Sequence, residues 1–312
     1  MLIYSLVFGT TFGQINCVFH NDTHASAGIG PNGEYNCFTC GAKAHNSAGF
    51  IAKYFQISFD RAKSIRYKLN NLQKYKYNQQ SVTQEQLKYL KGLGFSDPVI
   101  QKYFFCSSVG KLIFKQTWNG INVGYTWFNP TVLSAYNASA PKYKYDKNNI
   151  GGILTPYDDV IKYKTLIVTE GEKDMLIAKS LGIKNAVAKV GGAKTYMLGG
   201  LNIQDKQIVL VYDCDNWGRE GAINDAVALQ NRFNCKVKVV DLGLPNKGED
   251  LHDYFVKYKH TKQDFYNLIK ATPLFVAPPD INLSRVEKFV KGLSTEEFDE
   301  LKKIIKKEKQ DV

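Results

Sequence analysis

Two short motifs near the start of the chain have the residue types and the spacing of a metal site. Cys17 and His20 are separated by two residues, and Cys37 and Cys40 repeat this spacing after a gap of sixteen residues. Three thiolates and one imidazole can fill the four positions of a tetrahedral structural zinc site. Because no position would remain open for a substrate, we expect this Zn²⁺ to stabilise the fold rather than to catalyse a reaction.

Other assignments of these residues are available. His24 and His45 lie nearby in the sequence and could replace His20, although their spacing fits the motif less well. A set of buried free cysteines is the alternative to a metal site. It is the weaker explanation, because so short a section needs a covalent or metal staple to fold.

A second group of candidate ligands is acidic and follows the ends of expected strands. Glu170 closes "TLIVTE", Asp213 and Asp215 close the apolar run "QIVLVYDCD", and Asp250 follows "KVKVVDL". Asp174 lies one helical turn after Glu170. The carboxyl ends of parallel strands meet at one edge of a sheet, so these side chains can converge there. Clustered carboxylates repel unless a cation lies between them, and hard oxygen ligands favour Mg²⁺ or Mn²⁺.

Each of these carboxylates also has a simpler structural explanation. Glu170 and Asp174 suit the first turn of a helix, where the dipole favours negative charge. Asp250 could cap the helix expected over "LHDYFVKY". Cys214, between the two aspartates, is interpreted as a small buried apolar residue. Four carboxylates at successive strand ends nevertheless favour metal binding over coincidence.

The elements that must position these groups follow from the apolar patterns. From residue 164 onward, strand patterns alternate with helical ones, including a helix over "EGAINDAVALQNRF", and this alternation predicts a parallel sheet with crossover helices. Upstream, "SVTQEQLKYLKGLGFSDPVIQKYFF" predicts two short helices, and "KLIFKQTWNGINVGYTWF" predicts a hairpin that turns at Asn119 and Gly120. The opening "MLIYSLVFGTTFG" is interpreted as a strand, and the rest of residues 1–57 as short strands and turns.

The predicted fold class is α/β (α+β mixed), and the expected divisions are listed in chain order. They are a zinc-ribbon domain at 1–57, a basic helix and linker at 58–80, a basic subdomain at 81–160, a parallel-sheet metal-binding subdomain at 161–272, and a helical tail at 273–312. The tail follows a proline break and has two amphipathic patterns with capping-box starts.

Composition limits the class of partner and the cellular setting. The net charge is +12, of which +11 falls within residues 61–150, interleaved with Tyr, Phe and Trp. Such a region suits single-stranded nucleic acid, although a solubilising lysine-rich surface is the alternative. Six cysteines without an export signal, and no apolar run of eighteen residues, predict a cytoplasmic protein with no membrane partner.

Three further stretches identify a family. "EGEKDMLIAKSLG", "VYDCDNWGREGA" and "LPNKGEDLHDYF" resemble the Toprim domain of primases, topoisomerases and some nucleases. Together with the upstream cysteine motifs, they resemble the DnaG-type DNA primases, and their wording is closest to bacteriophage primases. The family's leading helix before the zinc ribbon is not evident in this sequence. His252, followed by Asp253, occupies a position where the family often has a second acidic or amide residue.

The resemblance implies roles for particular residues. Glu170, Asp213, Asp215 and Asp250 would be catalytic metal ligands, as the carboxylate pattern also predicts. The resemblance also implies that basic residues contact the nucleotide or the DNA, and the candidates are Lys142, Lys144, Arg219 and Lys194. A solvated lysine turn and a helix-start ion pair are the alternatives for the "KYK" lysines and for Arg219, respectively.

The function implied is a DNA primase in a bacterial or phage-infected cell. It would make short RNA primers from ribonucleoside triphosphates on a single-stranded DNA template. The alternatives are a Toprim nuclease and a non-catalytic single-strand-binding adaptor for a helicase. The sequence contains no P-loop ATPase motif, so we expect a separate replicative helicase as partner, with the tail as its docking element.

Overall fold

A computed structural model of the chain describes residues 2–71, 80–107, 110–118, 121–128, 143–145, 149–200 and 203–277. By its internal contacts the chain divides into two compact units, Met1–Phe275 and Val276–Val312. The predicted tail helices and the Asn119-Gly120 turn therefore lie outside the described residues. In the part of the chain that is described, no helix is long and apolar enough to cross a bilayer.

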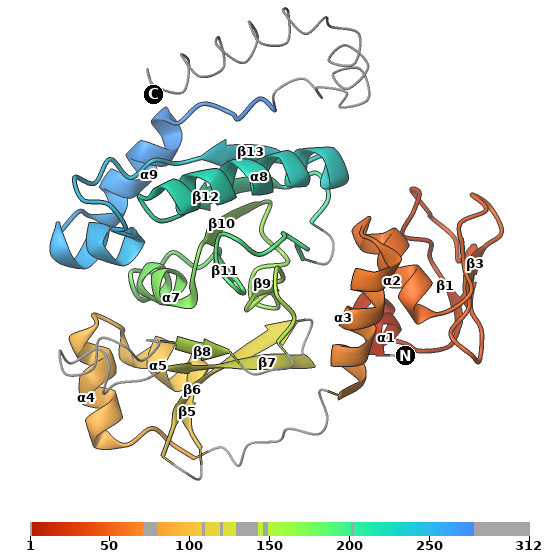
Figure 1. The fold of residues 1–312 in the computed structure, drawn as a ribbon, viewed down its shortest axis with the longest axis horizontal. Coiled ribbons are helices and arrows are strands. Elements are labelled where there is room, and N and C mark those ends of the chain that lie inside the picture. Colours follow the sequence, from red (N-terminus) through yellow and green to blue (C-terminus); the bar gives the residue numbers. More distant parts are fainter. Residues whose placement is uncertain are drawn as a thin grey trace, which may run out of the picture. The chain divides into compact units, whose positions relative to one another are not determined.

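The N-terminal module contains a small antiparallel sheet of order β1-β2-β3-β4 and three helices (Figure 1). The bounds of its elements are α1 Leu2–Phe8, β1 Gly13–Ile15, β2 Ala27–Ile29, β3 Tyr35–Cys37, β4 Lys43–Ala44, α2 Ser47–Phe55 and α3 Phe59–Asn71. The side chain of Asn46 caps α2 by accepting from the N–H groups of Ala48 and Gly49. The helix predicted within 58–80 thus corresponds to α3.

Two expectations about the first residues are wrong. The opening segment forms α1 rather than a strand, and this helix precedes the small sheet, where the family's leading helix was thought to be absent. Tyr4 and Phe8, four residues apart, stack with their ring centroids 6.4 Å apart, and Tyr4 also packs on Phe50 of α2. The expectation of strands and turns alone also missed α2. A short apolar run fits either helix or strand, and here the aromatic cluster selects the helix.

A second antiparallel sheet has the order β5-β6-β7-β8. Its strands, and the two helices before it, have these bounds: α4 Gln84–Gly92, α5 Asp97–Tyr103, β5 Phe104–Cys106, β6 Leu112–Trp118, β7 Ile121–Phe128 and β8 Tyr143–Tyr145. Thr83 and Gln86 form a complete capping box at the start of α4. The two predicted helices and the antiparallel pairing of β6 with β7 are confirmed.

The third sheet has the order β13-β12-β10-β11-β9, and its strands are parallel except β9. The bounds of its elements are β9 Leu154–Thr155, β10 Thr165–Thr169, α7 Glu172–Ser180, β11 Ala186–Lys189, β12 Gln207–Val211, α8 Asn216–Phe233, β13 Lys236–Val239, the π-helical turn η2 Asp253–Lys257 and α9 Lys262–Ala271. The predicted strand and helix alternation, and with it the mixed α/β fold class, is confirmed.

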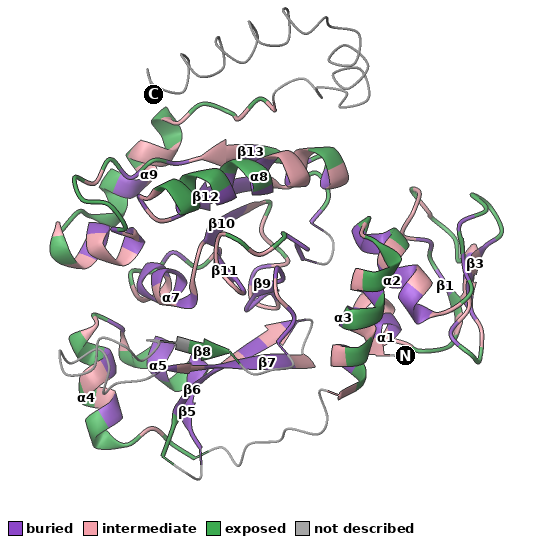
Figure 2. Cartoon of the chain, in the orientation of Figure 1, coloured by how far each residue is buried: buried purple, intermediate pink, exposed green. Residues whose placement is uncertain are grey.

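The two crossover helices cover opposite faces of this sheet. Ile167 and Val209 share a cluster with the apolar side chains of α7, whereas Val168 and Leu210 share one with those of α8. Successive strand residues point to opposite faces, so a continuously apolar strand is the pattern that a sheet covered on both faces requires. Figure 2 shows these strands as buried and the outer side of α8 as exposed.

Two boundaries differ from prediction at the functional edge of the sheet. Strand β12 ends at Val211, so Asp213 and Asp215 follow the strand rather than form its last residues. The predicted helix at Glu220 begins four residues earlier, at Asn216, because Asp215 acts as its N-cap. The two aspartates therefore lie in a tight turn, in which the N–H of Asp215 donates to the carbonyl of Asp213 at 2.8 Å.

Candidate metal centres

The four predicted zinc ligands come together in the N-terminal module. The ligand atoms of Cys17, His20, Cys37 and Cys40 all lie within 4.8 Å of one another. The sulfurs of Cys17 and Cys40 are 3.7 Å apart, and Nδ1 of His20 is 3.9 Å from the sulfur of Cys37. This donor set suits a closed tetrahedral site, and the cluster fits a zinc ribbon.

Hydrogen bonds around the four residues orient them toward a common centre. The carboxylate of Asp22 accepts from the N–H of Cys17 at 2.6 Å and lies 3.6 Å from Nε2 of His20. The hydroxyl of Tyr35 donates to the sulfur of Cys17 at 3.0 Å. A carboxylate on the outer nitrogen of a ligand histidine fixes which ring nitrogen faces the metal. His20 therefore has its Nε2 near a carboxylate, at a separation longer than a hydrogen bond, and its Nδ1 on the side of the cysteine sulfurs.

The other two histidines considered lie apart from this cluster. His45 is exposed, and Nδ1 of His24 is 2.9 Å from the hydroxyl of Thr23. Burial would raise the pKa of Cys37, but the N–H of Cys40 and the hydroxyl of Ser26 donate to its sulfur and lower that pKa to about 6. A thiol that ionises near neutral pH is largely present as the thiolate, which is the form that binds a metal cation.

Three of the predicted carboxylates converge at the C-terminal edge of the parallel sheet. The carboxylate oxygens of Asp174, Asp213 and Asp250 lie within 4.8 Å of one another. Asp174 comes from the first turn of α7, Asp213 from the turn after β12, and Asp250 from the loop after β13. The neighbouring Cys214 is buried, as predicted, and its N–H donates to the carbonyl of Glu249, which holds the second loop against the third.

Backbone contacts hold the remaining two predicted ligands beside this cluster. Glu170 accepts from the N–H of Asp213 at 3.3 Å and from the N–H of Ala193 at 3.2 Å. Asp215 accepts from the N–H of Gly218 at 2.7 Å as the cap of α8. The geometric group therefore contains neither Glu170 nor Asp215, although both adjoin it. Asp250 combines two predicted roles, since it also accepts from the N–H of Asp253 at 2.9 Å.

The electrostatics of the cluster favour a divalent cation. Burial, together with the charges of Glu170 and Asp250, raises the pKa of Asp213 to about 8. Burial and Asp250 likewise raise the pKa of Asp174 well above its usual range. Raised carboxyl pKa values show that the negative charge is not fully neutralised by the protein. Hard oxygen donors that lack a compensating charge are the chemistry that fits Mg²⁺ or Mn²⁺.

One lysine partly compensates for this charge. The ammonium of Lys173 lies 2.5 Å from Oδ2 of Asp250, and both side chains are mostly buried. Burial would lower the pKa of Lys173, but the carboxylates of Asp174 and Asp250 raise it. The sequence reasoning missed this residue, although a basic residue inside the acidic "EGEKD" motif is a visible signal.

His252 has one ring nitrogen hydrogen-bonded away from the carboxylates, yet its imidazole, Asp250 and Asp253 also form a group whose ligand atoms lie within 4.8 Å of one another. Its Nε2 donates to the carbonyl of Leu93 at 2.7 Å, and its ring meets Phe95 edge-on. Its backbone N–H donates to Asp174 at 3.0 Å. The backbone at this position therefore orients one candidate ligand, while the imidazole joins the loop to the segment after α4.

The predicted basic contacts have different surroundings. Arg219 lines a pocket of about 200 Å³ together with Asp213, and its guanidinium lies 3.7 Å from Asp241. Lys144 is exposed on β8 with its ammonium 5.8 Å from the ring centre of Trp127. Lys194 lines a second pocket, beside α8. Lys142 lies outside the described residues.

The sequence pattern did not predict a special role for Glu172 either. This side chain of α7 is 4% exposed, and it accepts hydrogen bonds from Thr126 at 2.8 Å, Gln116 at 3.1 Å and Tyr145 at 3.3 Å. These three neutral donors come from β7, β6 and β8, so one carboxylate joins the parallel-sheet helix to all three strands. Its partners are 27 to 56 residues away in the sequence, and no local pattern reveals them.

Comparisons with known proteins agree with this architecture. Residues 167–255 match a family model described as Toprim-like. The DNA primase of Campylobacter jejuni is 24% identical over 322 aligned positions, which cover 81% of this chain and 52% of that protein. The DNA primase of Helicobacter pylori is 36% identical over 87 residues, which cover 27% of this chain and 16% of that protein. The chain thus spans about half the length of the Campylobacter relative.

A solved structure shows a similar fold over most of the chain. The crystal structure of the Aquifex aeolicus primase, with its zinc-binding and RNA polymerase domains, matches with a TM-score of 0.51 and 19% identity. The match covers 90% of this chain and 81% of that one. Fold and ligand clusters define a protein with a zinc-ribbon module and a Toprim domain. Within that class, the chain is similar to bacterial DNA primases, as the sequence motifs predicted. The closer likeness to phage primases remains a prediction.

Proposed function

We propose that this protein is a DNA primase, a DNA-directed RNA polymerase that makes short RNA primers on single-stranded DNA during replication. The observation that carries the proposal is the convergence of Asp174, Asp213 and Asp250, with Glu170 bonded to the same turn, at the edge of a Toprim-like sheet. The relationship to bacterial DNA primases supports primer synthesis among the reactions that such a site can perform.

The carboxylate cluster is suited to Mg²⁺ or Mn²⁺, which Asp174, Asp213 and Asp250 would hold, with Glu170 and Asp215 as adjoining ligands. Bound divalent ions lower the pKa of an attacking 3′-hydroxyl and neutralise a pyrophosphate leaving group. The chain contributes the orientation of these carboxylates through backbone N–H groups. The four-residue cluster of the N-terminal module is suited to structural Zn²⁺.

The polar partners of such a reaction would meet particular basic residues. Arg219 lines the pocket that contains Asp213, so its guanidinium is suited to bind the phosphates of a ribonucleoside triphosphate. Lys111 and Lys144 both approach the ring of Trp127, at 3.6 Å and 5.8 Å. Cations beside an aromatic ring suit the backbone and bases of a single-stranded template. Lys142 and a helicase-docking tail remain further predictions.

A synthesis assay tests the proposal directly. The protein is incubated with single-stranded template, four ribonucleotides (one of them labelled) and Mg²⁺, and the products are separated on a denaturing gel. A primase gives short, alkali-labile products whose sequence depends on the template, and Asp213→Asn gives none. Cleavage of a labelled template without synthesis would identify a nuclease, and template binding without either reaction would identify an adaptor.

A further inference from the structure

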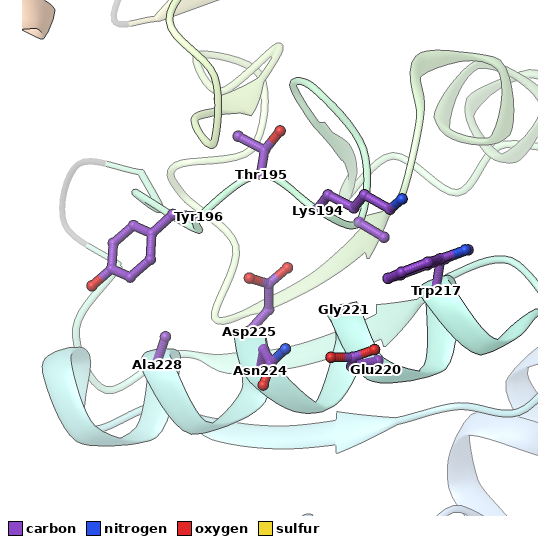
Figure 3. Close-up of a pocket in the computed structure, with 10 residues that line it drawn as sticks. Lys194, Thr195, Tyr196, Trp217, Glu220, Gly221, Asn224, Asp225 and Ala228 are labelled. Atoms are coloured by element: carbon purple, nitrogen blue, oxygen red, sulfur yellow. The ribbon is translucent and has the colours of Figure 1, made fainter. Parts of the chain in front are cut away.

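A pocket of about 410 Å³ lies between α8 and the loop of residues 193–196. This volume falls within the range of about 300–1,000 Å³ that is common for small-molecule sites. Figure 3 shows Lys194 and Trp217 facing each other at one end of the pocket and Tyr196 at the other. The helix contributes residues spaced three and four apart, so one face of α8 forms one wall.

Buried interactions hold the opposite wall in place. Lys189 is fully buried, and its ammonium donates to the carbonyls of Ala193 at 3.1 Å and Thr195 at 2.9 Å. The same ammonium pairs with Asp225, whose carboxylate also accepts from the hydroxyl of Tyr212 at 2.6 Å. The loop is thus tied through one lysine to the floor of the pocket. Because these walls are already held in place, the lining residues lose little conformational entropy when a ligand binds.

An aromatic ring and a cation form the end of the pocket. The side chain of Trp217 is 56% exposed, which is unusual for so large an apolar group. The ammonium of Lys194 lies 3.5 Å from its ring centre. Base stacking on an exposed indole beside a cation is the contact by which proteins bind single-stranded nucleic acids without regard to sequence.

The charges of the lining select a single nucleotide of a strand over a free triphosphate. Among the described residues that line the pocket, Lys194 is the single cation, and Glu220 is an exposed anion on the helix wall. One phosphodiester carries one negative charge, which Lys194 can match, whereas a triphosphate carries about four. Asn224 adds an amide that can donate to or accept from the edge of a base.

The same pocket adjoins the carboxylate site on both of its walls. Trp217 follows Asp215, the cap of α8, by two residues. Lys194 follows Ala193, whose N–H donates to Glu170. Gly221 permits this close approach, because a Cβ there would lie 2.7 Å from the Cβ of Ala193. A nucleotide in this pocket would therefore lie beside the proposed site of synthesis.

We propose that Trp217 and Lys194 bind one nucleotide of the single-stranded template, the indole by stacking on its base and the ammonium by contacting its phosphate. This inference deepens the proposed primase function by assigning a template contact next to the carboxylate site. It depends on that function for the identity of the strand as template, but not for the binding itself.

The test measures the anisotropy of a labelled single-stranded oligonucleotide, with Mg²⁺ present and ribonucleotides absent. We expect Trp217→Ala to weaken binding about tenfold and Trp217→Phe, which keeps a stacking face, to weaken it less than about threefold. Leu181→Ala is the control, because Leu181 is an exposed apolar residue at the end of α7 and lines neither this pocket nor the pocket of Arg219. Lys194→Gln should reduce the slope of log affinity against log salt by about 0.7, the contribution of one phosphate contact on a single strand.

The outcomes separate this inference from the proposed function. If Trp217→Ala binds the oligonucleotide as tightly as the wild type, the pocket assignment is wrong even if primers are made. If wild type binds through Trp217 and Lys194 but makes no primer, the pocket assignment stands and the primase proposal fails. Tryptophan fluorescence gives a second reading. The part of the fluorescence that disappears in Trp217→Phe comes from Trp217. If free ATP quenches this emission and the oligonucleotide does not, the assignment of the pocket to a nucleic-acid strand is wrong.

Discussion

Replacing Lys173 with methionine tests whether this lysine acts as a resident cation for the carboxylate cluster. The ammonium lies 2.5 Å from Asp250, with the two side chains 22% and 13% exposed. Removing one partner of a buried ion pair costs about 3–5 kcal/mol. Both side chains remain partly exposed to solvent, and the freed carboxylate can bind a proton instead, so we expect a loss below this range, of about 2–3 kcal/mol.

This loss predicts a specific pattern of thermal stability. At about 2–4 °C per kcal/mol, Lys173→Met should unfold about 4–12 °C below the wild type in protein without added divalent metal. Saturating Mg²⁺ or Mn²⁺ should restore most of the difference, because a divalent ion supplies the missing charge and stabilises the folded state that binds it. The same variant should bind Mn²⁺ more tightly at pH 8, since the metal no longer competes with an ammonium for Asp250.

The assay combines thermal unfolding followed by circular dichroism with Mn²⁺ binding followed by electron paramagnetic resonance. Lys162→Met is the control, because it removes the same charge and side chain from an exposed position. The reasoning would be refuted if Lys173→Met unfolded at the wild-type temperature without metal. Equal Mn²⁺ affinity in the variant and the wild type would refute the competition between lysine and metal.

Four other expectations follow. Asp213→Asn should reduce primer yield to background, and it should leave the metal-free protein at least as stable as the wild type, because it removes a charge that the neighbouring carboxylates repel. A primer yield equal to that of the wild type in the gel assay would contradict this. Cys37→Ser should lose the one zinc per chain that elemental analysis detects in the wild type, and it should impair initiation more than extension of an annealed primer. Burial lowers the pKa of Lys179 to about 8. The folded protein therefore favours the neutral amine: stability is full above the unfolded pKa of about 10.4, where the amine is neutral in both states, and it is lost as the pH falls through 8 and the buried amine must be protonated. Lys179→Met should therefore stabilise the protein at pH 7 by about 1–2 kcal/mol, after allowing for the lost hydrogen bond to the Lys184 carbonyl, and should raise the unfolding temperature accordingly. In the wild type the unfolding temperature should increase between pH 7 and 9.5, and in the variant this increase should be smaller. Deleting residues 280–312 should leave priming on naked template intact and abolish stimulation by a replicative helicase, so unchanged stimulation would contradict a docking role for the tail.

The sequence predicted the parallel sheet because its strands carry their own signal. A strand covered on both faces must be apolar at every position, and "QIVLV" can hardly form anything else between polar turns. The cysteine cluster was equally predictable, since ligand spacing is a local property. The opening segment was not, because seven apolar residues satisfy both helix and strand patterns. Contacts of this segment with distant residues, such as the packing of Tyr4 on Phe50, 46 positions away, decide between them.

The parts of the candidate site that escaped prediction depend on contacts between distant segments. Glu172 looks like a residue of a helix first turn, yet it is buried under three strands. Asp22 lies outside both cysteine motifs, yet its carboxylate lies near His20. Trp217, within a motif that was recognised, was not singled out because the exposure of a side chain cannot be read from the motif itself. In each case the partner, and not the residue type, defines the role.

The turn after β12 explains how two carboxylates can lie so close to each other just beyond a fully apolar strand. The N–H of Asp213 donates to Glu170, and its carbonyl lies so close to α8 that a Cβ on Gly218 would be 2.2 Å from it. Only glycine fits there, and this contact sets the first turn of α8 directly on the carboxylate loop. Because β12 is buried on both faces, it cannot shift its register without exposing apolar residues. A rigid strand, a capped helix and shared backbone bonds together fix the positions of charges that would otherwise move apart, which is the arrangement that a preorganised cation site requires.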